Sequence, residues 1–233
     1  MTAPTSSNWL RVGATVAAGR LRPPVGSSRR RSVCGAARVL TGLGVRVEVH
    51  VPATAWPRTG TGLLLVSNTA TALDPLALLT VVPGAAVAGV PDRLAGVPVP
   101  AVPAVSARIA TSRRRGTSVS VRPEEGVRSG PGLGRFSPAL LAAAVDAGAS
   151  VCPVAVRWRG GASPPPGGRS TMAAVRWLAA SPGTVVEVHL LPALSSAGAT
   201  AQELATSAEY AVAAVLETPS PAPSRGSRRA CEA

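Results

Sequence analysis

Two short polar segments stand where a protein of alternating strands and helices usually binds its ligand. The first, Asn-Thr-Ala-Thr-Ala-Leu-Asp at residues 68–74, follows the apolar run at residues 62–67. The second, Arg-Pro-Glu-Glu-Gly at residues 122–126, follows the alternating run at residues 117–121. In open α/β sheets, ligands bind at the carboxyl ends of the strands. The carboxylates and hydroxyls of these two segments are therefore the first candidates for chemistry.

Other residue types that often carry chemistry are scarce. The two histidines, His50 and His189, each lie near the end of an alternating strand. Either could serve as a base only if the fold brought it within hydrogen-bond reach of Thr69. Cys152 lies inside an apolar run and is expected to pack as a buried thiol, because no histidine is paired with it in the sequence. The 3 cysteines have no metal-ligand spacing, and no metal is expected.

Composition limits the class of protein. The 233 residues favour one domain of ordinary size with loose ends, and a hydrophobic content of 46% suffices for a core. The formal net charge is +13, and every basic side chain is arginine, which suggests a compositional bias as much as a function. No apolar run is long enough to cross a bilayer, and no signal-peptide pattern is apparent. Aromatic residues make up 3% of the chain, which argues against a base-stacking nucleic-acid surface.

The order of elements predicts an α/β fold, a single domain with a mostly parallel sheet flanked by helices. Strands are expected at residues 45–50, 62–67, 85–90, 117–121, 150–157 and 184–190. Helices are expected at residues 34–41, 74–82, 139–147, 171–180 and, from a capping box, 200–216. A further short helix could form at residues 9–18. We divide the chain into a basic, flexible N-terminal segment (1–33), the α/β domain (34–216) and a disordered tail (217–233).

The order and spacing of these motifs resemble the phospholipid/glycerol acyltransferases, the 1-acylglycerol-3-phosphate acyltransferase type. That family carries Asn-His, four residues and Asp after one strand, Phe-Pro-Glu-Gly-Thr after another, and a later Pro-Val-Ala strand. The corresponding strings here are residues 68–74, residues 122–126 and Pro153-Val154-Ala155. The resemblance runs from about residue 38 to residue 191 and covers most of the chain.

The resemblance implies acyl transfer from acyl-CoA or acyl carrier protein to the hydroxyl of 1-acylglycerol 3-phosphate or a similar glycerolipid, with no other cofactor. The family's histidine is the general base and its aspartate holds that histidine, which places Thr69 and Asp74 at the catalytic positions. Arg108, Pro123 and Glu124 match its substrate-binding positions. A threonine hydroxyl is no base near neutral pH, so we expect a degenerate site with impaired activity.

Each matched residue also has a purely structural interpretation. Asp74 precedes Pro75 and can be the N-cap of the helix that follows. Glu124 can be a solvated loop carboxylate, and Arg108 can match by chance in an arginine-rich chain. Only residues 109–116 separate Arg108 from the next strand, which predicts either a local change of strand order or poor packing, because a parallel crossover needs about a dozen residues.

Two non-enzymatic alternatives remain open. The arginine clusters at residues 29–31, 113–115 and 228–229 could attract anionic lipid headgroups, which would place a cytoplasmic protein peripherally at the inner face of the cell membrane. The same charge could bind nucleic acid non-specifically through phosphates, but no nucleic-acid motif is present and this partner is not expected. The expected partners are thus a lysophospholipid or glycerol-phosphate acceptor, an acyl donor and an anionic membrane surface.

Overall fold

The computed structural model describes residues 27–57, 61–125, 133–160 and 170–217. The possible helix at residues 9–18 and most of the predicted tail lie outside these ranges. Seven strands form one sheet in the order β1-β9-β8-β2-β7-β3-β6. All neighbours in it are parallel except β8 and β9, which are antiparallel. The predicted α/β fold with a mostly parallel sheet is confirmed.

The strands of the sheet are short except at one side. They are β1 (Arg46–His50), β2 (Leu64–Ser67), β3 (Ala86–Ala88), β6 (Ala101–Val102), β7 (Val119–Val121), β8 (Val151–Arg159) and β9 (Val185–Leu190). Strands β4 (Arg93–Leu94) and β5 (Val97–Pro98) pair with each other as a separate antiparallel hairpin. The sequence does not predict this hairpin, because a strand of two residues is too short to show an alternating hydrophobic pattern.

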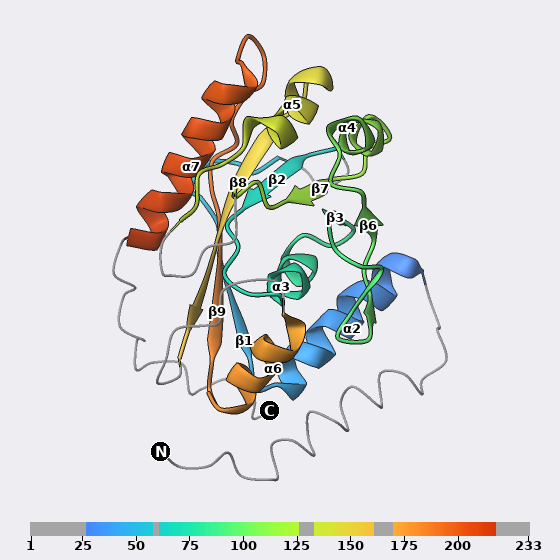
Figure 1. Cartoon of the computed structure of the whole chain (residues 1–233), viewed down its shortest axis with the longest axis vertical. Coiled ribbons are helices and arrows are strands. Elements are labelled where there is room, and N and C mark those ends of the chain that lie inside the picture. The colour runs from blue at the N-terminus through green and yellow to red at the C-terminus, as the bar shows by residue number, and fades with distance from the viewer. Residues whose placement is uncertain (1–26, 58–60, 126–132, 161–169, 218–233) are drawn as a thin grey trace, which may run out of the picture.

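In the described ranges, six helices cover the two faces of the sheet in two groups (Figure 1). On one face lie α2 (Ser28–Gly42), α3 (Asp74–Val81) and α6 (Thr171–Ala179), and on the other α4 (Ser106–Arg114), α5 (Pro138–Asp146) and α7 (Ala201–Glu217). Successive strand residues serve opposite faces, as strand geometry requires. In β2, Leu65 packs with the first group, whereas Leu64 and Val66 pack with the second.

Two helices differ from the sequence expectation. The helix α2 begins at Ser28, six positions before the predicted start at 34, so the run of arginines at 29–31 forms its first turn. Ser27 caps it by accepting a hydrogen bond from the backbone N–H of Arg30. The helix α7 begins as predicted: the Thr200 hydroxyl accepts from the backbone N–H of Glu203, and the Glu203 carboxylate accepts from the backbone N–H of Thr200. That geometry is the capping box.

The short segment after Arg108 still accommodates a crossover helix. The helix α4 supplies the crossover from β6 to β7, and its Ile109 and Ala110 are buried against the sheet. The buried guanidinium of Arg113 donates to the carbonyl of Ala143 near the end of α5. The crossover fits because α4 itself starts at Ser106, before the segment that we had counted as available.

The strand β8 continues well past the end of β2. Its first residues, Val151–Val154, pair with Leu64–Ser67 of β2, whereas Val154–Arg159 pair with β9. The carboxyl end of β2 is therefore flanked by the outer half of β8, with β9 and β1 beyond it. This arrangement provides one wall for the segment that follows β2.

Candidate functional site

The segment after β2 begins with an asparagine that extends the sheet by one side chain. The Asn68 amide nitrogen donates to the carbonyl of Val156 at 2.9 Å, and its amide oxygen accepts from the Val156 backbone N–H at 2.7 Å. Asn68 thus satisfies both backbone groups of a β8 residue after β2 has ended. The bonds are buried, so they fix where the following residues start.

Asp74 closes the same segment from its other end. Its carboxylate is fully buried and accepts from the backbone N–H groups of Ala70 and Thr71, from the Thr71 hydroxyl and from the indole N–H of Trp158. The bonds from Ala70 and Trp158 both measure 2.7 Å. Burial raises the pKa of Asp74, and the hydrogen bonds that it accepts counteract this. Asp74 therefore bends residues 70–74 into a compact loop pinned to β8.

The N-cap interpretation of Asp74 is wrong. Leu73 occupies the N-cap position of α3, and no side chain caps that helix. Asp74 is instead the first helical residue and bonds backward, to N–H groups of the loop that precedes it. An aspartate immediately before a proline fits both arrangements, and the sequence does not distinguish between them.

Glu124 contacts Thr69 through the Thr69 backbone. Its Oε1 atom accepts from the backbone N–H of Thr69 at 2.7 Å. Glu124 follows β7 and forms an isolated antiparallel bridge with Phe136, while the carbonyl of the buried Pro123 accepts from the backbone N–H of Ser137. The Pro-Glu pair is thus part of an ordered loop end, and Glu124 contacts protein rather than solvent alone.

The structure brings four of the five predicted site residues together. Thr69, Asp74, Pro123 and Glu124 lie on the two adjacent loops that follow the paired strands β2 and β7. The fifth, Arg108, has an exposed side chain in the first turn of α4. In the described part of the chain, its guanidinium forms no hydrogen bond or ion pair with the other four.

Neither histidine lies beside Thr69. His50 and His189 stack on each other and flank Glu187, and neither forms a hydrogen bond or ring contact with Thr69 within the described ranges. They lie on the sheet face opposite to Trp158 and Asp74, because Glu187 and His189 alternate along β9 with the core residues Val186 and Val188. Among the described residues, neither imidazole is placed to act together with the Thr69 hydroxyl.

Cys152 behaves as the sequence predicts. It is fully buried in β8, and burial raises its pKa to about 12. A thiol in that state is a poor nucleophile. We therefore exclude it from the candidate site.

Two contributors to the site were missed in the sequence. Asn68 lies inside the first motif without a role of its own, and Trp158 is not among the candidate residues; the Trp158 ring also forms an edge-on pair with that of Trp177, with their centroids 6.1 Å apart. The strand expected at residues 150–157 ends one residue before Trp158, which β8 includes. Only the pairing of β8 with β2, which is non-local, shows that the indole reaches Asp74.

The sheet order and the loops after β2 and β7 together define a glycerolipid-acyltransferase-like fold. Among solved structures, the chain resembles the crystal structure of the 1-acyl-sn-glycerophosphate (LPA) acyltransferase PlsC from Thermotoga maritima, with a TM-score of 0.62 and 17% sequence identity. The match covers 92% of this chain and 97% of that one. No protein-family model and no curated protein sequence matches the chain. The expected resemblance is thereby confirmed at the level of the fold.

None of the helices in the described ranges combines the length and the apolar character needed to cross a membrane.

Proposed function

We infer that this chain binds a glycerolipid acceptor and an acyl thioester at the loops after β2 and β7, and that it transfers the acyl chain poorly. The observation that carries the proposal is the bond from Thr69 N–H to Glu124, which joins the base-position loop to the Pro-Glu loop. The fold shared with PlsC, itself a 1-acyl-sn-glycerophosphate acyltransferase, supports the same assignment.

The loss of rate follows from the residue type at position 69. A hydroxyl cannot accept the proton of the attacking alcohol near neutral pH, and general-base catalysis is worth roughly 10² to 10⁴ in rate. Asp74 adds to this loss, because both of its oxygens already accept hydrogen bonds from the loop and from Trp158. It would therefore hold an imidazole at position 69 only by giving up one of those bonds.

The experiment is an acyl-transfer assay with 1-acylglycerol 3-phosphate and acyl-CoA or acyl carrier protein, comparing the natural chain with Thr69→His. We expect turnover by the natural chain to be barely above background and Thr69→His to raise it by about 10², the low end of the range for a base. Thr80→His is the matched control, because Thr80 lies on α3 away from the loop. Turnover by the natural chain equal to that of Thr69→His would refute the argument.

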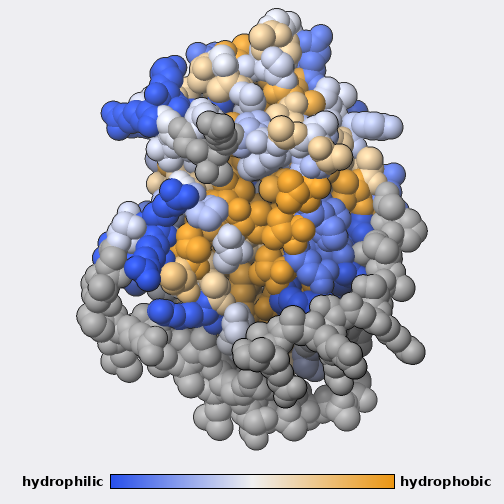
Figure 2. Space-filling model, turned by 180° about the vertical axis from the view of Figure 1, so that it is seen from behind, coloured by the Kyte–Doolittle hydropathy of each residue, from blue (hydrophilic) through white to orange (hydrophobic). Residues whose placement is uncertain are grey.

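Lipid binding without catalysis is the second candidate. The face turned away from the viewer in Figure 1 carries a continuous apolar area bordered by hydrophilic side chains, as Figure 2 shows. Together with the net charge of +13, this favours contact with an anionic lipid surface. Sedimentation with vesicles that contain or lack anionic lipid tests it. Binding that persists when Thr69→His fails to restore turnover would favour this candidate.

A further inference from the structure

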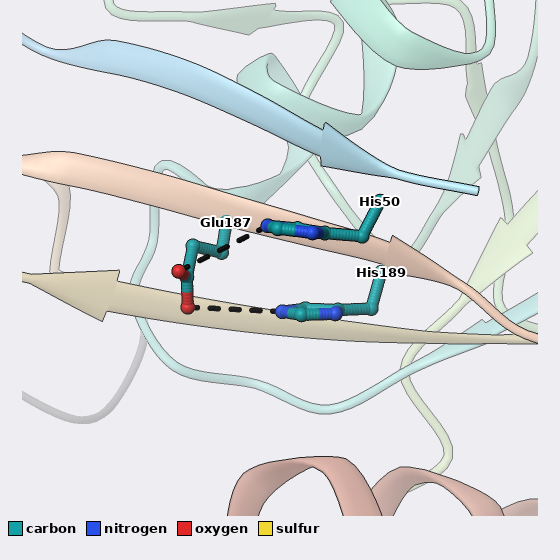
Figure 3. Close-up of side chains that lie close together, drawn as sticks. All are labelled: His50, Glu187 and His189. Atoms are coloured by element: carbon teal, nitrogen blue, oxygen red, sulfur yellow. Dashed lines mark ion pairs between the residues drawn. The ribbon is translucent and has the colours of Figure 1, made fainter. Parts of the chain in front are cut away.

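A cluster of two imidazoles and one carboxylate lies on the sheet face opposite to Asp74. His50 and His189 are register partners on the parallel strands β1 and β9, and Glu187 is two residues before His189. Residues two apart on a strand point to the same face, and register partners on neighbouring strands lie side by side. Figure 3 shows the three side chains converging, with both rings directed toward the carboxylate.

The donor atoms are close enough to share one ion. Nε2 of His50 lies 3.9 Å from one Glu187 oxygen, and Nε2 of His189 lies 3.7 Å from the other. One ligand atom from each of the three residues lies within 4.8 Å of the others. A tetrahedral ion with bonds of about 2.0 to 2.2 Å needs its ligand atoms roughly 3.3 Å apart. The three ligand atoms must therefore move closer together, from within 4.8 Å of one another to roughly 3.3 Å.

The side chains can make that contraction by rotation. The imidazole rings are stacked with their centroids 4.2 Å apart and their planes 8° from parallel, so each must turn about its outer torsion to aim at a common point. That torsion has a broad energy profile in histidine. Nε2 of His189 is buried and lies 3.7 Å from a Glu187 oxygen, so turning this ring toward the carboxylate shortens a contact that already exists.

We propose that His50, His189 and Glu187 form a binding site for a divalent transition-metal ion, with Zn²⁺ as the representative. Imidazole nitrogen and carboxylate oxygen together suit Zn²⁺, Ni²⁺ and Cu²⁺, whereas Mg²⁺ prefers oxygen ligands and water. The His50 side chain is 43% exposed, so an ion can reach the site from solvent. Water would take the fourth coordination position of the ion. The ion would join β1 to β9.

Two arginines on β8 set the strength of this site. Arg159 lies 2.6 Å from the Glu187 oxygen that faces His50, and Arg157 lies 3.9 Å from the other. They pair with the carboxylate and fix its orientation, as outer groups do around a metal ligand. They also repel a cation, so we expect weaker binding than the same three ligands would give without these arginines.

The site is independent of the acyl-transfer proposal. The three ligands share no hydrogen bond with Thr69, Asp74 or Glu124 within the described ranges, and they lie across the sheet from Asp74. Zinc binding can therefore fail while acyl transfer is restored by Thr69→His, and the reverse can also occur.

The sequence makes the test unusually clean, because His50 and His189 are its only histidines. The full chain is prepared without a histidine tag and with Cys34→Ser and Cys231→Ser, which removes two thiols that could bind zinc. Zinc chloride is then titrated while the imidazole resonances are followed by ¹⁵N–¹H NMR. We expect both imidazoles to shift together and to saturate at one zinc ion per chain, with no shift in magnesium chloride.

Single substitutions distinguish the three proposed metal ligands from nearby residues that do not bind the ion. His50→Asn and His189→Asn should each weaken zinc binding by at least tenfold. Because the exposed His50 can be replaced without opening the core, that variant keeps the test valid if His189→Asn or Glu187→Gln fails to fold. The matched control is Glu48→Gln, which removes a charge beside Glu187 but no ligand and should change affinity less than threefold. Unshifted imidazoles at about 1 mM zinc, or unchanged affinity in His50→Asn, would overturn the proposal.

Discussion

The Asp74 carboxylate offers the sharpest test of how the candidate site is held, through Asp74→Asn. The amide has the same shape but replaces one acceptor oxygen with a donor. One carboxylate oxygen accepts from Ala70 and Thr71 N–H groups at 2.7 and 2.9 Å. The other accepts from the Thr71 hydroxyl at 2.9 Å and from Trp158 at 2.7 Å. Whichever way the amide turns, one donor faces another.

The magnitude follows from those bonds. Each hydrogen bond to a charged group contributes roughly 1.5 to 3 kcal/mol, and one or two are lost. Removing the buried charge recovers part of this, because a desolvated carboxylate is unfavourable. We therefore expect Asp74→Asn to lower the free energy of unfolding by about 2 to 4 kcal/mol at pH 7.

The pH dependence has a definite sign. Burial raises the pKa of Asp74 in the folded state above its value of about 3.9 in the unfolded chain. The folded state then binds the proton more tightly, so this group adds stability that is complete below about pH 4 and is lost as pH rises through the folded-state pKa. Asp74→Asn has no such titration. The stability difference between the natural chain and the variant should therefore grow as pH falls from 7 toward 4.

The assay is urea unfolding followed by tryptophan fluorescence and circular dichroism at several pH values. Taking the difference between the two proteins cancels the other carboxylates, which titrate in both. Glu125→Gln, at an exposed carboxylate beside the same site, is the control and should change little. A difference that shrinks on acidification would refute the reasoning, because it would mean that the donors around Asp74 outweigh its burial.

Two further predictions concern neighbouring residues. Asn68→Ala leaves both backbone groups of Val156 without their side-chain partner, so it should lower the free energy of unfolding by about 2 to 4 kcal/mol in the same urea assay, and an effect below about 0.5 kcal/mol would show that water replaces the amide. Because burial raises the pKa of Cys152 to about 12, iodoacetamide at pH 8 should label Cys34, which is only partly buried, and leave Cys152 intact in the native protein, as peptide mass analysis can show. Labelling of Cys152 as fast as Cys34 would contradict its placement in the core.

Much of the fold could be predicted because its signals are local. The apolar run before Asn68, the alternation near His50 and the capping box at Thr200 all describe neighbours in the sequence. The start of α2 was missed because its first turn is made of arginines, which resemble a solvated segment by composition. The N-cap interpretation of Asp74 failed because a partner of its carboxylate, Trp158, lies 84 positions away.

The candidate site could be predicted only as two segments. That Glu124 reaches the backbone of Thr69 depends on the pairing of β2 with β7, which no local pattern encodes. The cluster around Glu187 was harder still, because it requires β1 to pair with β9 across most of the chain. Before that register is known, His50 and His189 are two unrelated residues at strand ends.

In the outer half of β8, successive side chains point to opposite faces of the sheet. Trp158 supports the loop at Asp74, while Arg157 and Arg159 hold Glu187 on the reverse side. Shifting this strand by a single position would exchange the two sets, setting an indole against Glu187 and a guanidinium against Asp74. An insertion or deletion of one residue within β8 would thus dismantle both clusters at once, whereas a change of two would preserve the facing of every side chain.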